Sequence, residues 1–119
     1  MPDREATRAA VDRVLAALEP LPVHARAMFG GYGLYLDGVM FALIAYDTLY
    51  FKVDDGNRGD FLAAGMRPFT YQGKRRPVEM SYYAVPPHLF DDSGALAAWA
   101  DGAHRAAQRA RRTPPRRRR

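Results

Sequence analysis

The dipeptide Asp37-Gly38, inside LYLDGVMFALIAY, limits the folds open to this chain more than any other stretch. Aspartate followed by glycine supplies the two positive φ angles that a two-residue β-hairpin turn requires. The residues on both sides, 34–36 and 39–46, are mainly aliphatic and aromatic, as is typical of strands that face a core. The stretch therefore predicts two antiparallel strands, and with them an antiparallel sheet.

Two further elements flank this hairpin. From Asp3 to about Leu18, apolar residues recur at spacings of three and four, which predicts an amphipathic helix that ends at Pro20. After the turn at Asp47-Thr48, residues 49–53 alternate between apolar and more polar side chains. We expect a half-buried strand there, with Leu49, Phe51 and Val53 on one face and Tyr50 and Lys52 on the other.

The second half continues with a short helix, two strands and a long helix. The short helix ends at Gly65, and strands at 69–71 and 78–85 flank the polar turn QGKRRP. Asp91, Asp92 and Ser93 are candidate N-cap residues of the last helix. The order α-βββ-α-ββ-α predicts an α+β fold, a five-stranded antiparallel sheet with flanking helices. One face of the last helix is expected to carry Leu96, Trp99, Ala103, Ala106, Ala107 and Ala110.

The glycine-rich stretch MFGGYGLYLDG, residues 28–38, is a candidate phosphate-binding loop. Such loops follow a strand, precede a helix and, in the P-loop, end in Lys and Ser or Thr. Here the glycines of residues 29–33 precede a strand, and no Lys-Ser or Lys-Thr follows. We therefore expect these glycines to serve the close approach of backbone to backbone in the sheet.

The residues that could carry catalysis or bind metal do not form a recognisable pattern. VDDGNRGD lacks the ligand spacing of a calcium loop, so Asp54, Asp55 and Asn57 indicate a turn and helix cap. Neither serine has the glycine elbow of a hydrolase nucleophile, and Glu79 has no partner carboxylate. We expect no enzyme, no metal and no cofactor. The remaining candidates are scattered: His24, His88, His104, Ser81 and Ser93.

All seven tyrosines lie within or beside the expected strands. Alternation sends Tyr82 and Tyr83 to opposite faces of the sheet. Exposed tyrosines, with Phe41 or Phe69, could anchor a protein partner or stack nucleic-acid bases, and β propensity alone also explains them. The residues expected to form an interaction surface are Tyr35, Tyr50, Tyr82 and Tyr83.

The net charge of +5 is concentrated at the C-terminus, because six of the eighteen basic residues lie in 111–119. Residues 1–110, the expected folded domain, carry twelve basic and thirteen acidic residues. The tail RRTPPRRRR is expected to be disordered, and it is either a solvated end or a nucleic-acid contact with a salt-sensitive affinity. The candidate contacts are Arg111, Arg112, Arg116, Arg117, Arg118 and Arg119.

The chain has no cysteine, no signal-peptide pattern and no apolar run long enough to cross a membrane. We therefore expect a cytoplasmic protein without disulfides and without a membrane partner.

The ordered segments MFGGYGLYLDGVMFALIAYDTLYFKVD, PFTY and VEMSYYAVPPHLFDD, followed by a Trp-bearing helix, resemble the N-terminal domain of the TfoX/Sxy competence-regulator family. The resemblance spans roughly residues 6–107. It implies a two-layer α+β fold similar to secretion chaperones and a role as a positive regulator of DNA-uptake genes, with no catalytic residues. It also implies a protein partner, such as the transcription machinery or a regulator, and we consider a homodimer. Full-length members carry a second, helical domain, so we expect a stand-alone first domain whose competence role is open.

Overall fold

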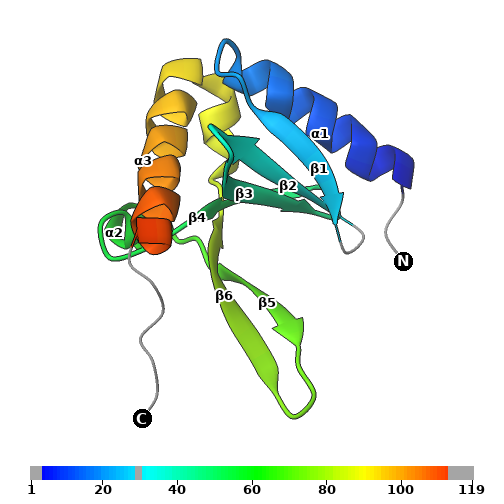
Figure 1. The fold of residues 1–119 in the computed structure, drawn as a ribbon, viewed down its shortest axis with the longest axis vertical. Coiled ribbons are helices and arrows are strands. Elements are labelled where there is room, and N and C mark those ends of the chain that lie inside the picture. Colours follow the sequence, from blue (N-terminus) through cyan, green and yellow to red (C-terminus); the bar gives the residue numbers. More distant parts are fainter. Residues whose placement is uncertain (1–3, 29–30, 113–119) are drawn as a thin grey trace.

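The computed structural model describes residues 4–28 and 31–112. These residues form three α-helices, six strands and one 3-10 helix, drawn in Figure 1. In chain order these are α1 (Arg4–Leu18), β1 (His24–Met28), β2 (Gly31–Leu36), β3 (Val39–Ala45), β4 (Thr48–Lys52), α2 (Arg58–Ala63), β5 (Pro68–Gln72), β6 (Pro77–Ala84), η1 (Pro87–Asp91) and α3 (Ser93–Arg112).

The strands form one antiparallel sheet in the order β1-β2-β3-β4-β6-β5. This confirms the predicted α+β class and antiparallel pairing. The prediction of five strands was wrong, because the sheet has six and the sequence reasoning missed β1. In HARAM the side chains of His24, Arg26 and Ala27 are all exposed. An edge strand with one paired side needs little apolar alternation, so no hydrophobic period marks it.

The hairpin that joins β2 to β3 turns at the predicted dipeptide. Asp37 has a φ of 54° and Gly38 a φ of 76°, and Leu36 pairs with Val39 across the turn. Two successive positive φ angles are the signature of a type I′ turn. The prediction from Asp37-Gly38 is therefore confirmed in conformation as well as in position.

The glycines before this hairpin have the structural role that the sequence indicates. A Cβ atom at Gly31 would overlap the carbonyl oxygen of Ile44 on the paired strand β3, so only glycine allows this close approach. Phe29 and Gly30, the start of the glycine-rich motif, lie outside the described residues.

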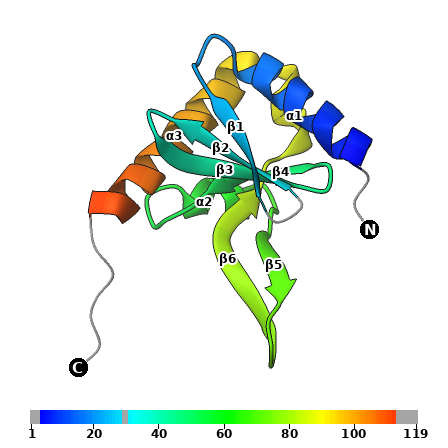
Figure 2. The same ribbon diagram turned by 45° about the vertical axis from the view of Figure 1, so that its right-hand side comes forward.

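Two helices cover one face of the sheet, and the described chain leaves the other face open (Figures 1 and 2). α3 packs on β3 and β4, and α1 packs on α3 and β3. The predicted alternation in β4 is confirmed: Leu49 and Phe51, and Val53 just after the strand, are buried. Tyr50 and Lys52 face the other way and are half-buried. The main hydrophobic cluster thus lies on the helical side of the sheet.

The long helix α3 largely follows its predicted face. Leu96, Ala103, Ala106 and Ala107 are buried, as expected, whereas Ala110 is exposed. The backbone N–H of Ala95 donates to Oδ1 of Asp92 at 3.1 Å, so Asp92 is the capping side chain among the three candidates.

Two of the six C-terminal arginines, Arg111 and Arg112, belong to the last turn of α3. Residues 113–119, which make up most of the predicted tail, lie outside the described residues.

The hairpin of β5 and β6 extends away from the rest of the molecule (Figures 1 and 2). Only the end of β6 pairs with β4, from Tyr82 to Ala84, and the carbonyl of Ser81 accepts a hydrogen bond of 2.9 Å from the backbone N–H of Val53. The four residues before Ser81 reach past the sheet. There β6 has β5 as its partner, with Thr70 opposite Glu79 and Gln72 opposite Pro77. We call residues 70–81 the ribbon; it is two-stranded and begins where the main sheet ends.

Candidate functional site

The open face of the sheet carries most of the side chains that could bind a partner. Residues paired directly across two antiparallel strands lie on the same face. The pairs Arg26 with Gly33 and His24 with Tyr35 therefore share a face of β1 and β2. On the strands beside them, the same face carries Met40, Leu43, Tyr50, Lys52 and Tyr82.

Three of the four tyrosines expected at an interaction surface lie on this open face. They are Tyr35, Tyr50 and Tyr82. Tyr83 points to the helical side, where its ring lies 6.0 Å from that of Phe61. Of the two phenylalanines considered with them, Phe69 lies 5.0 Å from the ring of Tyr50, whereas Phe41 is fully buried.

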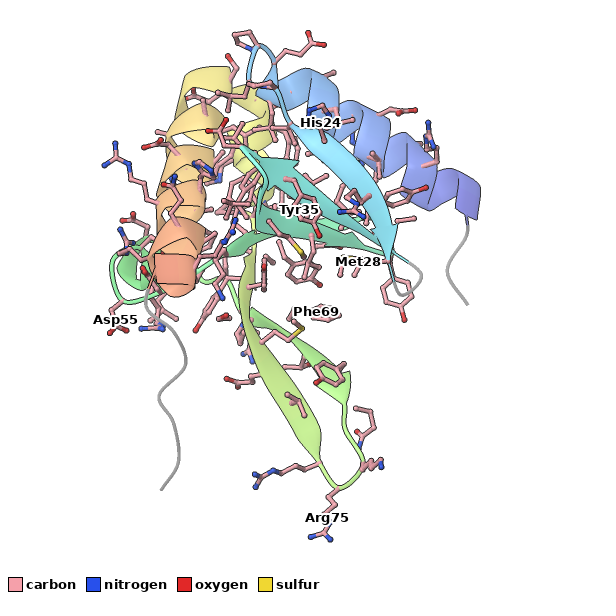
Figure 3. The ribbon with its side chains drawn as sticks, in the orientation of Figure 1. His24, Met28, Tyr35, Asp55, Phe69 and Arg75 are labelled. Carbon is pink, nitrogen blue, oxygen red and sulfur yellow. The ribbon has the colours of Figure 1, made fainter. Side chains whose placement is uncertain are left out.

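A groove of about 240 Å³ lies on the open face, between the main sheet and the root of the ribbon. Figure 3 shows Met28 and Phe69 on either side of it, at the end of β1 and on β5. Methionine side chains are unbranched and polarisable, and therefore adapt to differently shaped ligands. The lining consists of Met28, Gly31, Tyr32, Met40, Leu43, Ile44, Ala45, Tyr46, Phe69 and Met80.

Gly33 keeps space for the methionines at the edge of this groove. A Cβ atom at this position would lie 2.8 Å from Sδ of Met28 and 3.1 Å from Sδ of Met40. The two thioethers therefore lie directly over the backbone of β2. A larger residue at position 33 would displace both, so Gly33 contributes to the shape of the groove as well as to the sheet.

Two cations lie over aromatic rings of the open face. The guanidinium of Arg26 is 5.6 Å from the ring centre of Tyr35, and Nζ of Lys52 is 5.2 Å from that of Tyr82. Both distances fall within the range of cation–π attraction. Nζ of Lys52 also donates a hydrogen bond of 2.5 Å to Oγ of Ser81. These contacts hold the positive charges at the surface of the aromatic face.

Burial shifts the pKa of three groups on this face. It raises the pKa of the Tyr82 and Tyr50 hydroxyls, and the charge of Asp47 raises the pKa of Tyr50 further. It also lowers the pKa of Lys52, and the neighbouring charge of Asp54 opposes that shift. Both tyrosines therefore stay neutral at physiological pH and can donate hydrogen bonds to a partner.

The aspartate-rich segment after β4 forms the predicted turn, but the predicted helix cap was wrong, because Asn57 at the N-cap position of α2 makes no side-chain capping hydrogen bond. The backbone N–H of Asp54 donates to Oδ1 of Asn57 at 2.8 Å, and Nδ2 of Asn57 donates to the carbonyl of Lys52 at 3.0 Å. Asp54 is also bound by Arg109 of α3. Within residues 4–28 and 31–112, no three His, Cys, Asp or Glu side chains lie close enough together to hold a metal ion.

The arginines expected to contact nucleic acid are only partly described. Nη1 of Arg111 lies 3.4 Å from the carbonyl oxygen of Gly38, so this side chain reaches the β2–β3 turn. Arg112 is the last residue of α3, and Arg116, Arg117, Arg118 and Arg119 lie outside the described residues. In the part of the chain that the structure describes, no helix has both the length and the apolar character needed to span a membrane.

The sequence reasoning missed the groove methionines. Met28, Met40 and Met80 come from three strands separated in the chain, and each contributes one side chain to the groove. A signal was available for Met40, because it stands between the core-facing Val39 and Phe41 on its strand and is apolar yet directed away from the core. Met80 stands between the exposed Glu79 and Ser81, so alternation gives no such signal for it.

The model of the TfoX N-terminal domain family matches residues 14–107 of the 119-residue chain. This range begins within α1 and includes every strand, α2, η1 and most of α3. A comparison with curated proteins gave no match.

Proposed function

The chain belongs to the TfoX N-terminal domain family, and from that premise we propose that it is a non-enzymatic regulatory or adaptor domain that binds a protein partner through the open face of its sheet. The domain takes part in the positive regulation of DNA-uptake genes, as the family resemblance implies. The partner is a component of the transcription machinery or another regulator.

The observation that carries this proposal is the groove. It is lined by three methionines and several aromatic and aliphatic side chains, and it is open to solvent on the face that the helices leave uncovered. Anchors of protein interfaces are aromatic or aliphatic side chains that enter such pockets, with polar groups around them. The hydroxyls of Tyr35 and Tyr82 and the charges of Arg26 and Lys52 supply that polar surrounding.

The chemistry of the groove indicates the kind of segment it receives. Its apolar lining favours an aliphatic or aromatic anchor, and the nearby cations favour carboxylates beside that anchor. Methionine-lined surfaces accept anchors of more than one shape. The partner segment is therefore an exposed loop or helix with an apolar side chain flanked by acidic residues.

The proposal is tested by site-specific photo-crosslinking in native lysate treated with nuclease. A photoreactive residue at position 40, on the groove, is expected to capture a defined partner, and one at position 62, on α2, is not. Leu62 is the matched control because it is an apolar side chain that is 56% exposed and lies away from the open face. Nuclease treatment removes partners that are held only through nucleic acid.

A substitution pair supports the same test. In these variants the photoreactive residue is placed at position 46, which also lines the groove. Met40→Glu then places a carboxylate in the groove and is expected to abolish capture of that partner, whereas Leu62→Glu is expected to keep it. Equal capture from positions 40 and 62, or capture from position 46 that survives Met40→Glu in a folded protein, would contradict the proposal. Sedimentation of the purified chain shows whether a second copy occupies the groove. If the chain forms a dimer and Met40→Glu dissociates it, the ligand of the groove is a second copy of the chain and not another protein.

A further inference from the structure

We propose that the ribbon, residues 70–81, is a contact for duplex DNA that binds the phosphate backbone through the cations at its tip. This goes beyond the protein-binding role of the groove and does not depend on it. The geometric basis is that the ribbon is a free two-stranded element. Before Ser81, whose carbonyl still accepts a hydrogen bond from Val53, β6 is paired with no strand of the described chain except β5, so the outer part of the ribbon is accessible.

The tip of the ribbon carries three consecutive cations. The backbone N–H of Gly73 donates to the carbonyl of Arg76 at 2.9 Å, which closes the turn around Lys74 and Arg75. All three basic side chains are exposed, and Figure 3 shows Arg75 at the outermost point of the turn. Within residues 4–28 and 31–112, no carboxylate forms an ion pair with any of them.

Several arginines elsewhere in the described chain are paired with a carboxylate. Ion pairs join Arg8 to Asp12, Arg105 to Asp101, and Arg109 to Asp54, so these charges are partly neutralised by neighbouring aspartates. The ribbon has a single carboxylate, Glu79, which is opposite Thr70 and not at the tip. Residues 28–90 carry six basic and six acidic side chains, and three of the six basic ones lie together at the tip of the ribbon.

The shape of the ribbon favours a nucleic-acid duplex over an acidic protein. A two-stranded β-ribbon fits the major groove of B-form DNA, and basic side chains at its end then lie close to the phosphates. Gln72, Thr70 and Glu79 share one face of the ribbon and offer polar groups to base edges. Protein interfaces are centred on aromatic or aliphatic anchors, whereas the tip consists of exposed charged residues.

The experiment measures binding of a short fluorescent random-sequence DNA duplex over a series of salt concentrations. The triple variant Lys74→Gln, Arg75→Gln, Arg76→Gln is expected to weaken binding about tenfold or more at low salt. It is also expected to reduce the slope of log K against log salt by about 2 to 3, since each phosphate contact contributes about 0.9.

Two controls separate the ribbon from general charge and from the C-terminal arginines. Arg8→Gln, Arg13→Gln, Arg105→Gln removes the same charge from exposed helical positions and is expected to bind as the unaltered chain does. In a chain that ends at Arg112, the triple substitution in the ribbon is expected to weaken DNA binding by the same factor as in the full chain. Circular dichroism and the fluorescence of Trp99 verify that each variant is folded.

The proposal is overturned if the ribbon variant binds DNA like the unaltered chain, or if the helical triple variant loses affinity to the same degree. Loss of all binding on truncation at Arg112 would assign it to residues 113–119 instead. Equal binding of duplex RNA, whose major groove is too narrow for a ribbon, would also contradict it. So would displacement of DNA by polyglutamate at an equal concentration of charge, which would indicate an acidic protein as the ligand.

Discussion

Arg109 of α3 donates two hydrogen bonds to the carboxylate of Asp54, from Nε to Oδ2 at 2.7 Å and from Nη2 to Oδ1 at 2.8 Å. The two residues are 55 positions apart in the sequence, so this pair fastens the turn after β4 to the last helix. Oδ1 of Asp54 also accepts a hydrogen bond from the backbone N–H of Gly56 at 2.8 Å. One carboxylate thus organises its own turn and binds it to α3.

We expect Arg109→Ala to lower the melting temperature at neutral pH more than Arg105→Ala does. Both arginines are exposed on α3 and pair with an aspartate, but the partner of Arg105 is Asp101, one turn earlier on the same helix. Only Arg109 links two separate parts of the fold. Thermal unfolding followed by circular dichroism measures both effects, and equal losses would contradict a linking role.

The same pair predicts how stability depends on pH. The hydrogen bonds from Arg109, above all, lower the pKa of Asp54 below its ordinary value of 3.8. A carboxylate with a depressed folded-state pKa stabilises the fold above its ordinary pKa and loses that contribution as the pH falls through the folded-state pKa. The difference in melting temperature between the unaltered chain and Arg109→Ala should therefore be constant near neutral pH and shrink below about pH 4.

The buried His104 ties α3 to the end of β2. Its Nε2 lies 2.9 Å from the carbonyl oxygen of Leu36, which can only accept, so this nitrogen carries the proton. We expect His104→Phe, which keeps a ring beside Phe41, to lower the free energy of unfolding by about 1 kcal/mol through loss of the hydrogen bond. Urea unfolding measures the loss, and nitrogen NMR of the unaltered protein should show the Nε2–H tautomer.

The short helix α2 is held to the core by one aromatic side chain. Phe61 is 1% exposed, and its ring lies 4.7 Å from that of Trp99. We expect Phe61→Ala to lower the free energy of unfolding by about 3 to 5 kcal/mol, because it leaves a cavity. The neighbouring exposed Leu62 is the control, and Leu62→Ala should change the free energy by about 0.5 kcal/mol or less. Trp99, the single tryptophan, reports both transitions by fluorescence.

Gly38, in the turn between β2 and β3, can be compared with Gly59 in α2, because both have open space around them. A Cβ atom at Gly38 or at Gly59 would meet nothing within 4 Å, but only Gly38 has a positive φ. We expect Gly38→Ala to destabilise the fold by about 1 to 2 kcal/mol, the cost of the left-handed conformation. Gly59→Ala in α2 should instead stabilise it by about 0.4 to 1 kcal/mol. Urea unfolding curves that shift in the same direction would contradict this account.

The sequence predicted five of the six strands and missed β1, which contributes few side chains to the core. The alternation at residues 49–53 and the turn at Asp37-Gly38 are local patterns, and both were confirmed. β1 was missed because backbone pairing with β2, more than burial, keeps HARAM in the sheet. Ala110 was wrongly placed on the buried face of α3, because helical period alone does not show where the facing sheet ends.

The candidate site was less predictable than the fold, because its parts meet only in three dimensions. Tyr35, Tyr50 and Tyr82 could be named from strand alternation, but their common face depends on the strand order. The groove requires the end of β1 and the root of the ribbon to lie close together, and no spacing in the sequence encodes that proximity. The QGKRRP turn was recognised as polar, but its protrusion follows from the short pairing of β6 with β4.

Phe69 and Met80 line the groove, and they also stand where the ribbon leaves the sheet. These two residues therefore belong to both proposed contact surfaces, the groove and the ribbon. A substitution at either residue is exposed to selection through whatever fills the groove and through whatever the ribbon touches, so neither position can drift freely when one of the two ligands changes. Where the ligand of one surface differs between related proteins, we expect substitutions at Phe69 and Met80. These should be accompanied by substitutions among the residues of the other surface.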